Sequence, residues 1–133
     1  MKYLLDTHAL LWIAYEEHKI SSKIKKILLS ESAAFYISAV SFWEISIKSS
    51  MGKLDLKSHS PETLYKGFKA NFPCDFLPLS VEEAVTFFNL DKVHHKDPFD
   101  RMLVWQAIKN ELIIISEDNS IKLYEDTGVK ILW

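Results

Sequence analysis

The sequence contains little cysteine and little glycine. It has 133 residues, of which one is cysteine and three are glycine. A single cysteine, Cys74, excludes an internal disulfide framework and a cysteine-based zinc cluster, and it fits a reducing, cytoplasmic location. The glycines are not spaced for a phosphate-cradling loop, a dinucleotide fingerprint or a nucleophile elbow. These absences exclude many common classes of enzyme.

An excess of charge of one sign and long apolar runs are also missing. Sixteen Lys and Arg residues stand against 18 Asp and Glu, a formal net charge of -2. This balance argues against a polybasic nucleic-acid binder, but it allows an enzyme that grips nucleic acid locally. No run approaches about 18 uncharged apolar residues, so we expect no membrane-spanning segment. The 48% hydrophobic content predicts one packed globular domain over residues 1–133.

Short apolar runs rich in β-formers alternate with helical patterns. The predicted strands are Tyr3–Leu5, Phe35–Val40, Phe76–Leu79, Leu112–Ser116 and Lys130–Trp133. The predicted helices are His8 to about Glu17, Ser21 to about Glu31, Ser41 to about Met51, Pro61–Phe72, Ser80–Leu90, Pro98 to about Asn110, and Asn119–Asp126. Gly128 suits a helix stop, and the polar segment Lys53–Ser60 is a loop or a flap. This alternation predicts an α/β fold with a parallel sheet covered by helices on both sides.

Four acidic residues fall near the ends of predicted strands. Asp6 ends the first strand, Glu44 lies in the first turn of the helix after the second strand, and Asp118 follows the fourth strand. Asp100 lies in the first turn of the helix that leads into that fourth strand. In a parallel sheet these positions all face the carboxyl edge, where open α/β sheets place their sites.

Each acid taken alone is better explained as a helix cap. Ser41 and Glu44 have capping-box spacing, and Asp97 precedes a proline at the first helical position. Asp118 and either Asp6 or Thr7 can also cap helices. Four converging carboxylates would nevertheless repel one another, and a divalent cation would remove that repulsion. An all-oxygen set of ligands suits Mg²⁺ or Mn²⁺.

The motifs around these acids resemble those of a known family. They are Leu4–His8, Ser41–Ile45 with Lys48 and Gly52–Leu54, His95–Leu103 with Gln106–Ala107, and Ser116–Asp118. In order and spacing the chain resembles the PIN-domain ribonucleases, specifically the VapC-type toxins of bacterial toxin–antitoxin pairs. The resemblance runs from Met1 to Trp133, and the segment from His95 to Arg101 is its most specific part.

The resemblance implies a three-layer PIN-like fold with a central parallel sheet of about five strands flanked by helices. It implies a Mg²⁺- or Mn²⁺-dependent endoribonuclease, a hydrolase acting on transfer RNA or another structured RNA loop. It also implies a VapB-type antitoxin as partner and a homodimer. The family's metal-binding acids fall on Asp6, Glu44 and Asp100, with Asp118 as the fourth. Relatives usually carry threonine at the position of Ser116, and the serine keeps the hydroxyl group.

Roles for the site residues follow from this resemblance and from their chemistry. Asp6 and Asp100 are the expected metal ligands, Asp118 assists a second metal or a water, and Glu44 binds metal or orients the attacking water. The residues expected to support these four acids are Thr7 and Ser116, which hydrogen-bond carboxylates, and Asp97, which caps the helix and aims Asp100.

Several other residues have two readings each. Lys48 is either an ion-pair partner of Glu44 or a cation near the scissile phosphate, and Arg101 forms a structural salt bridge or contacts phosphate. Core packing is the first reading for the aromatic residues Trp12, Trp43 and Trp105, and a face covered by a partner is the second. His8, His94 and His95 are read as loop residues.

Two other functions remain open from the residues. A phosphatase with Asp6 as nucleophile would want a second aspartate two residues on, where this chain has His8. A non-catalytic metal- and RNA-binding module would keep the acids without cleaving RNA. The sequence does not decide which RNA is cut, or whether one or two metal ions act.

Overall fold

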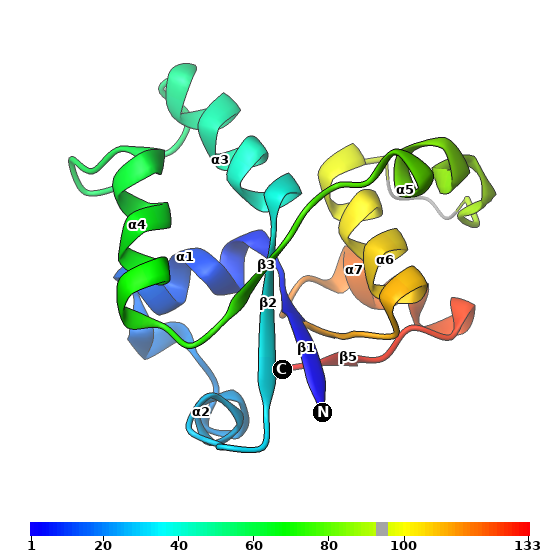
Figure 1. The fold of residues 1–133 in the computed structure, drawn as a ribbon, viewed down its shortest axis with the longest axis horizontal. Coiled ribbons are helices and arrows are strands. Elements are labelled where there is room, and N and C mark those ends of the chain that lie inside the picture. The colour runs from blue at the N-terminus through cyan, green and yellow to red at the C-terminus, as the bar shows by residue number, and fades with distance from the viewer. Residues whose placement is uncertain (93–95) are drawn as a thin grey trace.

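A computed structural model describes residues 1–92 and 96–133 of the chain. Its centre is a five-stranded sheet in the order β3-β2-β1-β4-β5 (Figure 1). The strands are β1 (Lys2–Leu5), β2 (Ala34–Ser38), β3 (Asp75–Leu77), β4 (Ile113–Ile115) and β5 (Ile131–Leu132). All four pairings are parallel, which confirms the predicted parallel sheet of about five strands.

Helices cover both faces of the sheet. They are α1 (Thr7–Tyr15), α2 (Ser22–Leu28), α3 (Ala39–Ser50), α4 (Pro61–Asn71), α5 (Val81–Thr86), α6 (Pro98–Asn110) and α7 (Asn119–Lys122), with 3₁₀ turns η1 (Glu17–Lys19), η2 (Phe87–Asn89) and η3 (Leu123–Thr127). Helices α1, α2 and α4 lie on one side of the sheet and α5, α6 and α7 on the other (Figure 1). This is the predicted three-layer arrangement.

The two layers of helices create two hydrophobic cores. Leu5 and Ile115 point into the core beneath α1, whereas their neighbours Leu4 and Ile114 point into the core beneath α6. A strand that is covered on both faces needs apolar residues at every position. This requirement explains why the central strands read as continuous apolar runs rather than as alternating ones.

The junction between β2 and α3 differs from the prediction. Helix α3 begins at Ala39, two residues before the predicted start, because the hydroxyl of Ser38 accepts a hydrogen bond from the backbone N–H of Val40 at 3.0 Å. The predicted strand up to Val40 and the capping box of Ser41 with Glu44 are therefore wrong. Ser41 lies within the helix, and Glu44 belongs to its second turn instead of its first.

The other differences lie at the ends of strands and helices; β3, for example, is Asp75–Leu77 instead of Phe76–Leu79. The predicted helices Ser80–Leu90 and Asn119–Asp126 are each a short α-helix that continues as a 3₁₀ turn. A capping box does occur, but Ser80 and Glu83 form it at the start of α5. Gly128 ends η3 with a φ of 96°, in the left-handed region that favours glycine, as predicted.

The segment Lys53–Ser60 contains neither helix nor strand, in agreement with the predicted loop. Leu56 within it is buried and anchors it to the core beneath α1. Across residues 1–92 and 96–133, no helix has both the length and the apolar character that a membrane crossing requires.

Candidate active site

Asp6 stands where β1 passes into α1 at the carboxyl edge of the sheet. Its backbone N–H still donates to the carbonyl of Ile115 on β4 at 3.1 Å, so the strand pairing holds the residue in place. One carboxylate oxygen accepts a hydrogen bond from the backbone N–H of Ala9 at 2.7 Å, which makes Asp6 the N-cap of α1. Only 2% of the residue is exposed. The cap therefore fixes a buried carboxylate at the start of the helix.

Asp118 and Ser116 occupy the neighbouring strand end. Asp118 caps α7 by accepting from the backbone N–H of Ser120 at 2.8 Å. The buried hydroxyl of Ser116 accepts from the backbone N–H of Asp118 at 3.0 Å and also hydrogen-bonds the carboxylate of Asp6. Ser116 thus links the first acid to the fourth, which is the supporting position predicted for it.

Asp97 and Asp100 begin α6. The Asp97 carboxylate accepts from the backbone N–H of Phe99 at 2.8 Å and from that of Asp100 at 3.1 Å, and Pro98 occupies the first helical position. The predicted cap is confirmed. Because the cap bonds the backbone N–H of Asp100 directly, it fixes the position from which the side chain of Asp100 projects.

Glu44 is held from two sides. The residue is 3% exposed, and one carboxylate oxygen accepts a hydrogen bond from the Thr7 hydroxyl at 2.7 Å. The other oxygen accepts from the ammonium group of Lys48 at 2.5 Å. The hydroxyl of Ser41 lies 3.1 Å from that of Thr7, a contact that its assignment as a cap did not anticipate. Thr7 and Lys48 therefore fix the orientation of the Glu44 carboxylate.

The four acids act on one another electrostatically. The pKa of Asp100 is raised from its ordinary 3.8 to about 8, first by burial and then by the negative charges of Asp97, Glu44, Asp118 and Asp6. All three other acids predicted for the site appear among these causes. The four acids therefore lie near enough to one another at this edge to influence the charge of Asp100, as expected from the parallel topology.

Asp6 and Lys48 respond to the same cluster. Burial raises the pKa of Asp6 to about 6, although hydrogen bonds from Ser116 and Ala9 oppose the shift. The pKa of Lys48 is raised by its hydrogen bond to Glu44 and by negative charges that include Asp100. The ammonium group of Lys48 therefore faces the carboxylates, as both predicted readings of this residue require.

The donor set suits a hard divalent cation. Clustered carboxylates with raised pKa values gain from a positive charge placed among them, and oxygen ligands are those that Mg²⁺ and Mn²⁺ prefer. Within the described part of the chain, no three His, Cys, Asp or Glu side chains are grouped closely enough to hold a metal ion. Mg²⁺ is usually held through one or two carboxylates and several waters, so the acids fit such an ion without a complete protein cage.

Arg101 makes structural contacts through hydrogen bonds and an aromatic ring, while the salt bridge predicted for it stays a prediction. Its guanidinium donates to the Tyr124 hydroxyl at 2.7 Å and to the carbonyl of Asp91 at 3.4 Å, and it lies 5.2 Å from the ring of Phe87. These contacts join α6 to η2 and η3. Contact of Arg101 with phosphate stays a prediction.

The histidines differ in what the structure says of them. His8 is exposed and lines a cavity of about 350 Å³ together with Asp6, Trp12 and Asp118. It is the second residue of α1, so the loop reading of His8 is wrong, although the residue does lie beside Asp6 and Asp118. His94 and His95 fall outside the described residues.

The tryptophans divide between core and surface. Trp105 is buried and its indole N–H donates to the Thr86 hydroxyl at 3.1 Å, while half-buried Trp12 packs edge-on against Trp133 at 5.3 Å. Trp43 is 58% exposed, so the core packing predicted for it is wrong. Its neighbours Glu44 and Ile45 are buried, and Trp43 points away from both cores.

One buried polar network was not predicted. The Ser38 hydroxyl donates to the side-chain oxygen of Gln106 at 2.5 Å, and the Gln106 amide donates to the carboxylate of Glu83 at 3.1 Å. Gln106 belongs to one of the sequence motifs, but the sequence predicts no role for it. The available signal was a glutamine among the apolar residues Leu103, Val104 and Ala107 of one helix.

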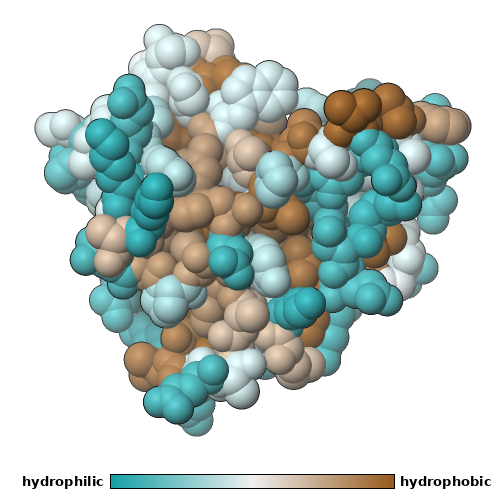
Figure 2. All heavy atoms as spheres, in the orientation of Figure 1, coloured by the Kyte–Doolittle hydropathy of each residue, from teal (hydrophilic) through white to brown (hydrophobic). Residues whose placement is uncertain are grey.

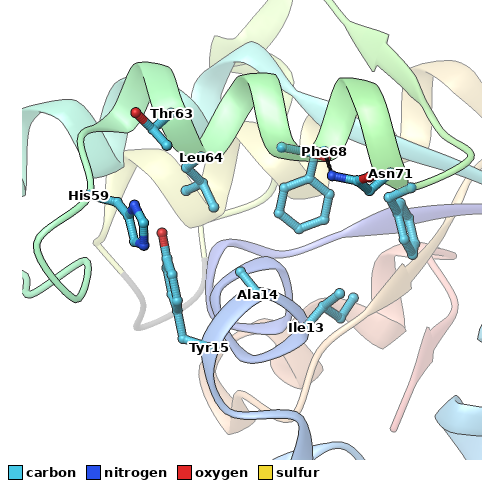
Figure 3. Close-up of a pocket in the computed structure, with 10 residues that line it drawn as sticks. Ile13, Ala14, Tyr15, His59, Thr63, Leu64, Phe68 and Asn71 are labelled. Carbon is cyan, nitrogen blue, oxygen red and sulfur yellow. Dashed lines mark hydrogen bonds between the residues drawn. The ribbon is translucent and has the colours of Figure 1, made fainter.

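The apolar cavity between α1 and α4 contains none of the candidate acids. It measures about 390 Å³ and is lined by side chains such as Ile13, Tyr15, Leu64 and Phe68 (Figure 3). The ring of His59 stacks on Tyr15 at its mouth. The ionisable groups with raised pKa values lie instead at the carboxyl edge of the sheet, which makes that edge the candidate site.

Comparison with known proteins is consistent with this arrangement. A protein-family model described as the PIN domain matches residues 3–126. No curated protein matches the chain by sequence.

Several solved structures share the fold over nearly the whole chain. One is described as VapBC2 from Rickettsia felis bound to a DNA fragment from the promoter, with a TM-score of 0.69, 17% identity, and coverage of 99% of this chain and 98% of that chain. DNA-bound VapBC from Salmonella typhimurium has a TM-score of 0.67 and 19% identity, with coverage of 99% of this chain and 97% of that chain. FitAcB from Neisseria gonorrhoeae has a TM-score of 0.61 and 18% identity, with coverage of 98% of this chain and 96% of that chain. At such identities the likeness establishes the fold.

Proposed function

The chain belongs to the PIN-domain family, and from this premise we propose that it is a divalent-metal-dependent endoribonuclease, the VapC-type toxin of a toxin–antitoxin pair. One observation carries the proposal: at the carboxyl edge of the sheet, burial and the negative charges of neighbouring acids together raise the pKa of Asp100 to about 8. A fold does not need this repulsion, because serine or asparagine would cap the same helices without it. A site that binds a divalent cation beside a phosphodiester does require several carboxylates close together, and their repulsion comes with them.

We assign the cation, Mg²⁺ or Mn²⁺, to Asp6 and Asp100, with Asp118 assisting. Such an ion activates water and neutralises negative charge on a reacting phosphate. Ser116 keeps Asp6 and Asp118 in register through its two hydrogen bonds. Glu44, whose two oxygens are held by Thr7 and Lys48, is placed to orient the attacking water.

Lys48 has a second role in this proposal. It forms the ion pair with Glu44, and the negative charges of Asp97 and Asp100 also contribute to raising the pKa of its ammonium group. A cation at the border of an acidic cluster offsets the repulsion that a phosphate meets there. We therefore expect Lys48→Met to lower cleavage more than Lys66→Met, which removes an exposed lysine of α4.

The partners follow from the same premise. RNA that is single-stranded or looped, such as a transfer RNA loop, is the proposed substrate, because its bases are free to be contacted. A VapB-type antitoxin is the proposed protein partner and a homodimer the proposed assembly, acting in the cytoplasm. The fold shared with structures described as VapBC complexes supports the antitoxin.

Cleavage of total transfer RNA by the purified, partner-free protein tests the proposal. With Mn²⁺ or Mg²⁺ we expect discrete products that disappear with EDTA. We expect Asp6→Asn and Asp100→Asn each to lower the rate at least about a hundredfold, because each removes a charge that binds the cation. Asp126→Asn, an exposed aspartate of η3, is the matched control and should cleave normally.

Two results would contradict the proposal. Full cleavage by both Asp6→Asn and Asp100→Asn would show that the acids do not carry the reaction. A folded protein that binds RNA and Mn²⁺ but cuts no RNA would favour the non-catalytic binding module.

A further inference from the structure

An exposed aromatic pair borders the acidic cluster. Trp43 directly precedes Glu44 on α3, and Phe99 directly precedes Asp100 on α6. Their ring centroids lie 5.4 Å apart with an interplanar angle of 78°, an edge-to-face contact. Phe99 is half-buried, whereas Trp43 is 58% exposed. The half-buried ring therefore braces the exposed one beside two of the four carboxylates.

Trp43 also lines a groove between α3, α4 and β3. The groove has a volume of about 740 Å³, and four aromatic rings line it, those of Phe42, Trp43, Tyr65 and Phe76. The last ring lies 5.9 Å from that of Phe42 and 5.0 Å from that of Tyr65. Figure 2 views the molecule toward the edge strand β3 and shows hydrophobic surface over β3 and between α3 and α4. Aromatic rings thus continue from Trp43 along the groove.

Charge is distributed in a complementary way at the same place. The ammonium group of Lys48 faces the carboxylates, one turn along α3 from Glu44. A nucleotide chain presents both chemistries in alternation, with a charged phosphate next to a flat base. The acids with their cation and Lys48 suit the phosphate, and the exposed face of Trp43 suits the base.

We propose that Trp43, braced by Phe99, stacks on an unpaired RNA base that flanks the phosphate held at the acidic cluster. This inference rests on the proposed nuclease function and deepens it. Stacking requires a base whose face is free, so the substrate is single-stranded or looped RNA rather than a continuous duplex. Because every base has a π-face, Trp43 contributes affinity and position without selecting one base.

The observations favour RNA over a protein segment as the occupant. Trp43 and Phe99 are the chain neighbours of Glu44 and Asp100, and their contact joins α3 to α6 at the positions that carry these two acids. A protein segment seated in the groove would not need the exposed ring to adjoin the acids. It is nevertheless the alternative that the experiment has to separate.

The test compares Trp43→Ala and Trp43→Phe with the unchanged protein. Binding of a fluorescently labelled single-stranded RNA is measured by anisotropy without Mg²⁺ or Mn²⁺, and cleavage of the same RNA is measured with Mn²⁺. We expect Trp43→Ala to weaken binding and to lower kcat/KM about tenfold, and Trp43→Phe to keep most of both, because phenylalanine still stacks. Phe88→Ala, which removes an even more exposed ring on η2, is the control and should change neither.

The outcomes separate this proposal from the proposed function. If the protein cuts RNA and Trp43→Ala binds and cuts it like the unchanged protein, the stacking role is overturned while the nuclease stands. If Trp43→Ala loses only the binding of an antitoxin peptide, the groove serves a protein and the proposal is likewise overturned. If the protein cuts no RNA, the nuclease fails, and a tenfold loss of RNA binding in Trp43→Ala would still support stacking. Unchanged melting temperatures exclude misfolding as the cause.

Discussion

Asp100 is the residue whose chemistry its surroundings alter most. Burial and four neighbouring carboxylates raise its pKa from 3.8 to about 8, so the metal-free protein holds a proton there near neutral pH. Asp6 follows with a pKa of about 6. Such a cluster destabilises the fold that carries it, which is a common cost of functional sites.

The stability of the metal-free protein should therefore depend on pH in a defined direction. A carboxyl group with a raised pKa stabilises the fold fully below its unfolded value, near 4, and this contribution is lost as the pH rises through 6 and 8. We expect the free energy of unfolding in urea, with EDTA present, to fall by about 1–3 kcal/mol from pH 5 to pH 8. This range allows for solvent screening at the partly exposed Asp100.

The variant Asp100→Asn should remove most of that decline, and it should make the metal-free protein more stable than the unchanged one at pH 8. Asp126→Asn serves as the control and should keep the original slope. A slope that is identical in Asp100→Asn would show that this carboxyl group is not the source of the pH dependence.

At the scale of elements, three helices are joined by the buried network of Ser38, Gln106 and Glu83. Ser38 caps α3, Gln106 lies in the middle of α6, and Glu83 closes the capping box of α5. Both ends of the Gln106 amide are used, because its oxygen accepts from Ser38 and its nitrogen donates to Glu83. The network therefore fixes α6, which carries Asp100, relative to α3, which carries Glu44.

Replacing Gln106 by leucine should destabilise the protein more than its small change in volume suggests. The change leaves the buried Ser38 hydroxyl without its acceptor and removes one hydrogen bond from the Glu83 carboxylate, which keeps those from Ser80 and Asn110. An unsatisfied buried group costs about 1–3 kcal/mol. We expect a loss of about 2–4 kcal/mol in urea unfolding.

Asn71→Ala is the matched control for Gln106→Leu. Its amide donates only to the carbonyl of Gly67 at the exposed end of α4, so a change within about 0.5 kcal/mol is expected. Losses of equal size in both variants would contradict the importance of the network.

At the scale of the whole molecule, a cation should stabilise the fold because it relieves the repulsion at the sheet edge. A ligand at a hundred times its Kd adds about 2.7 kcal/mol to the free energy of unfolding. We expect saturating Mn²⁺ at pH 8 to raise Tm by about 5–10 °C in a domain of this size.

The double variant Asp6→Asn with Asp100→Asn should show little of this shift, and calorimetry with and without Mn²⁺ measures it directly. An equal rise in Tm for the double variant would mean that Mn²⁺ binds elsewhere on the protein.

The sequence by itself determined the fold class and the edge at which the acids meet. Alternating strands and helices leave only a parallel sheet with two covered faces, and parallel strands put the residues that follow them at one edge. Local capping chemistry also determined the start of α6 at Pro98 and the placement of Asp97, because a cap involves only neighbouring residues.

Only the tertiary structure decided which side chains meet across the chain. Thr7 bonds Glu44 across 37 residues, and Ser38 bonds Gln106 across 68. The exposure of Trp43 and its contact with Phe99 likewise depend on how α3 sits against α6. Helical periodicity indicates that a residue lies on a particular stripe, but it does not say whether another element covers that stripe. That depends on packing between segments that are far apart in the sequence.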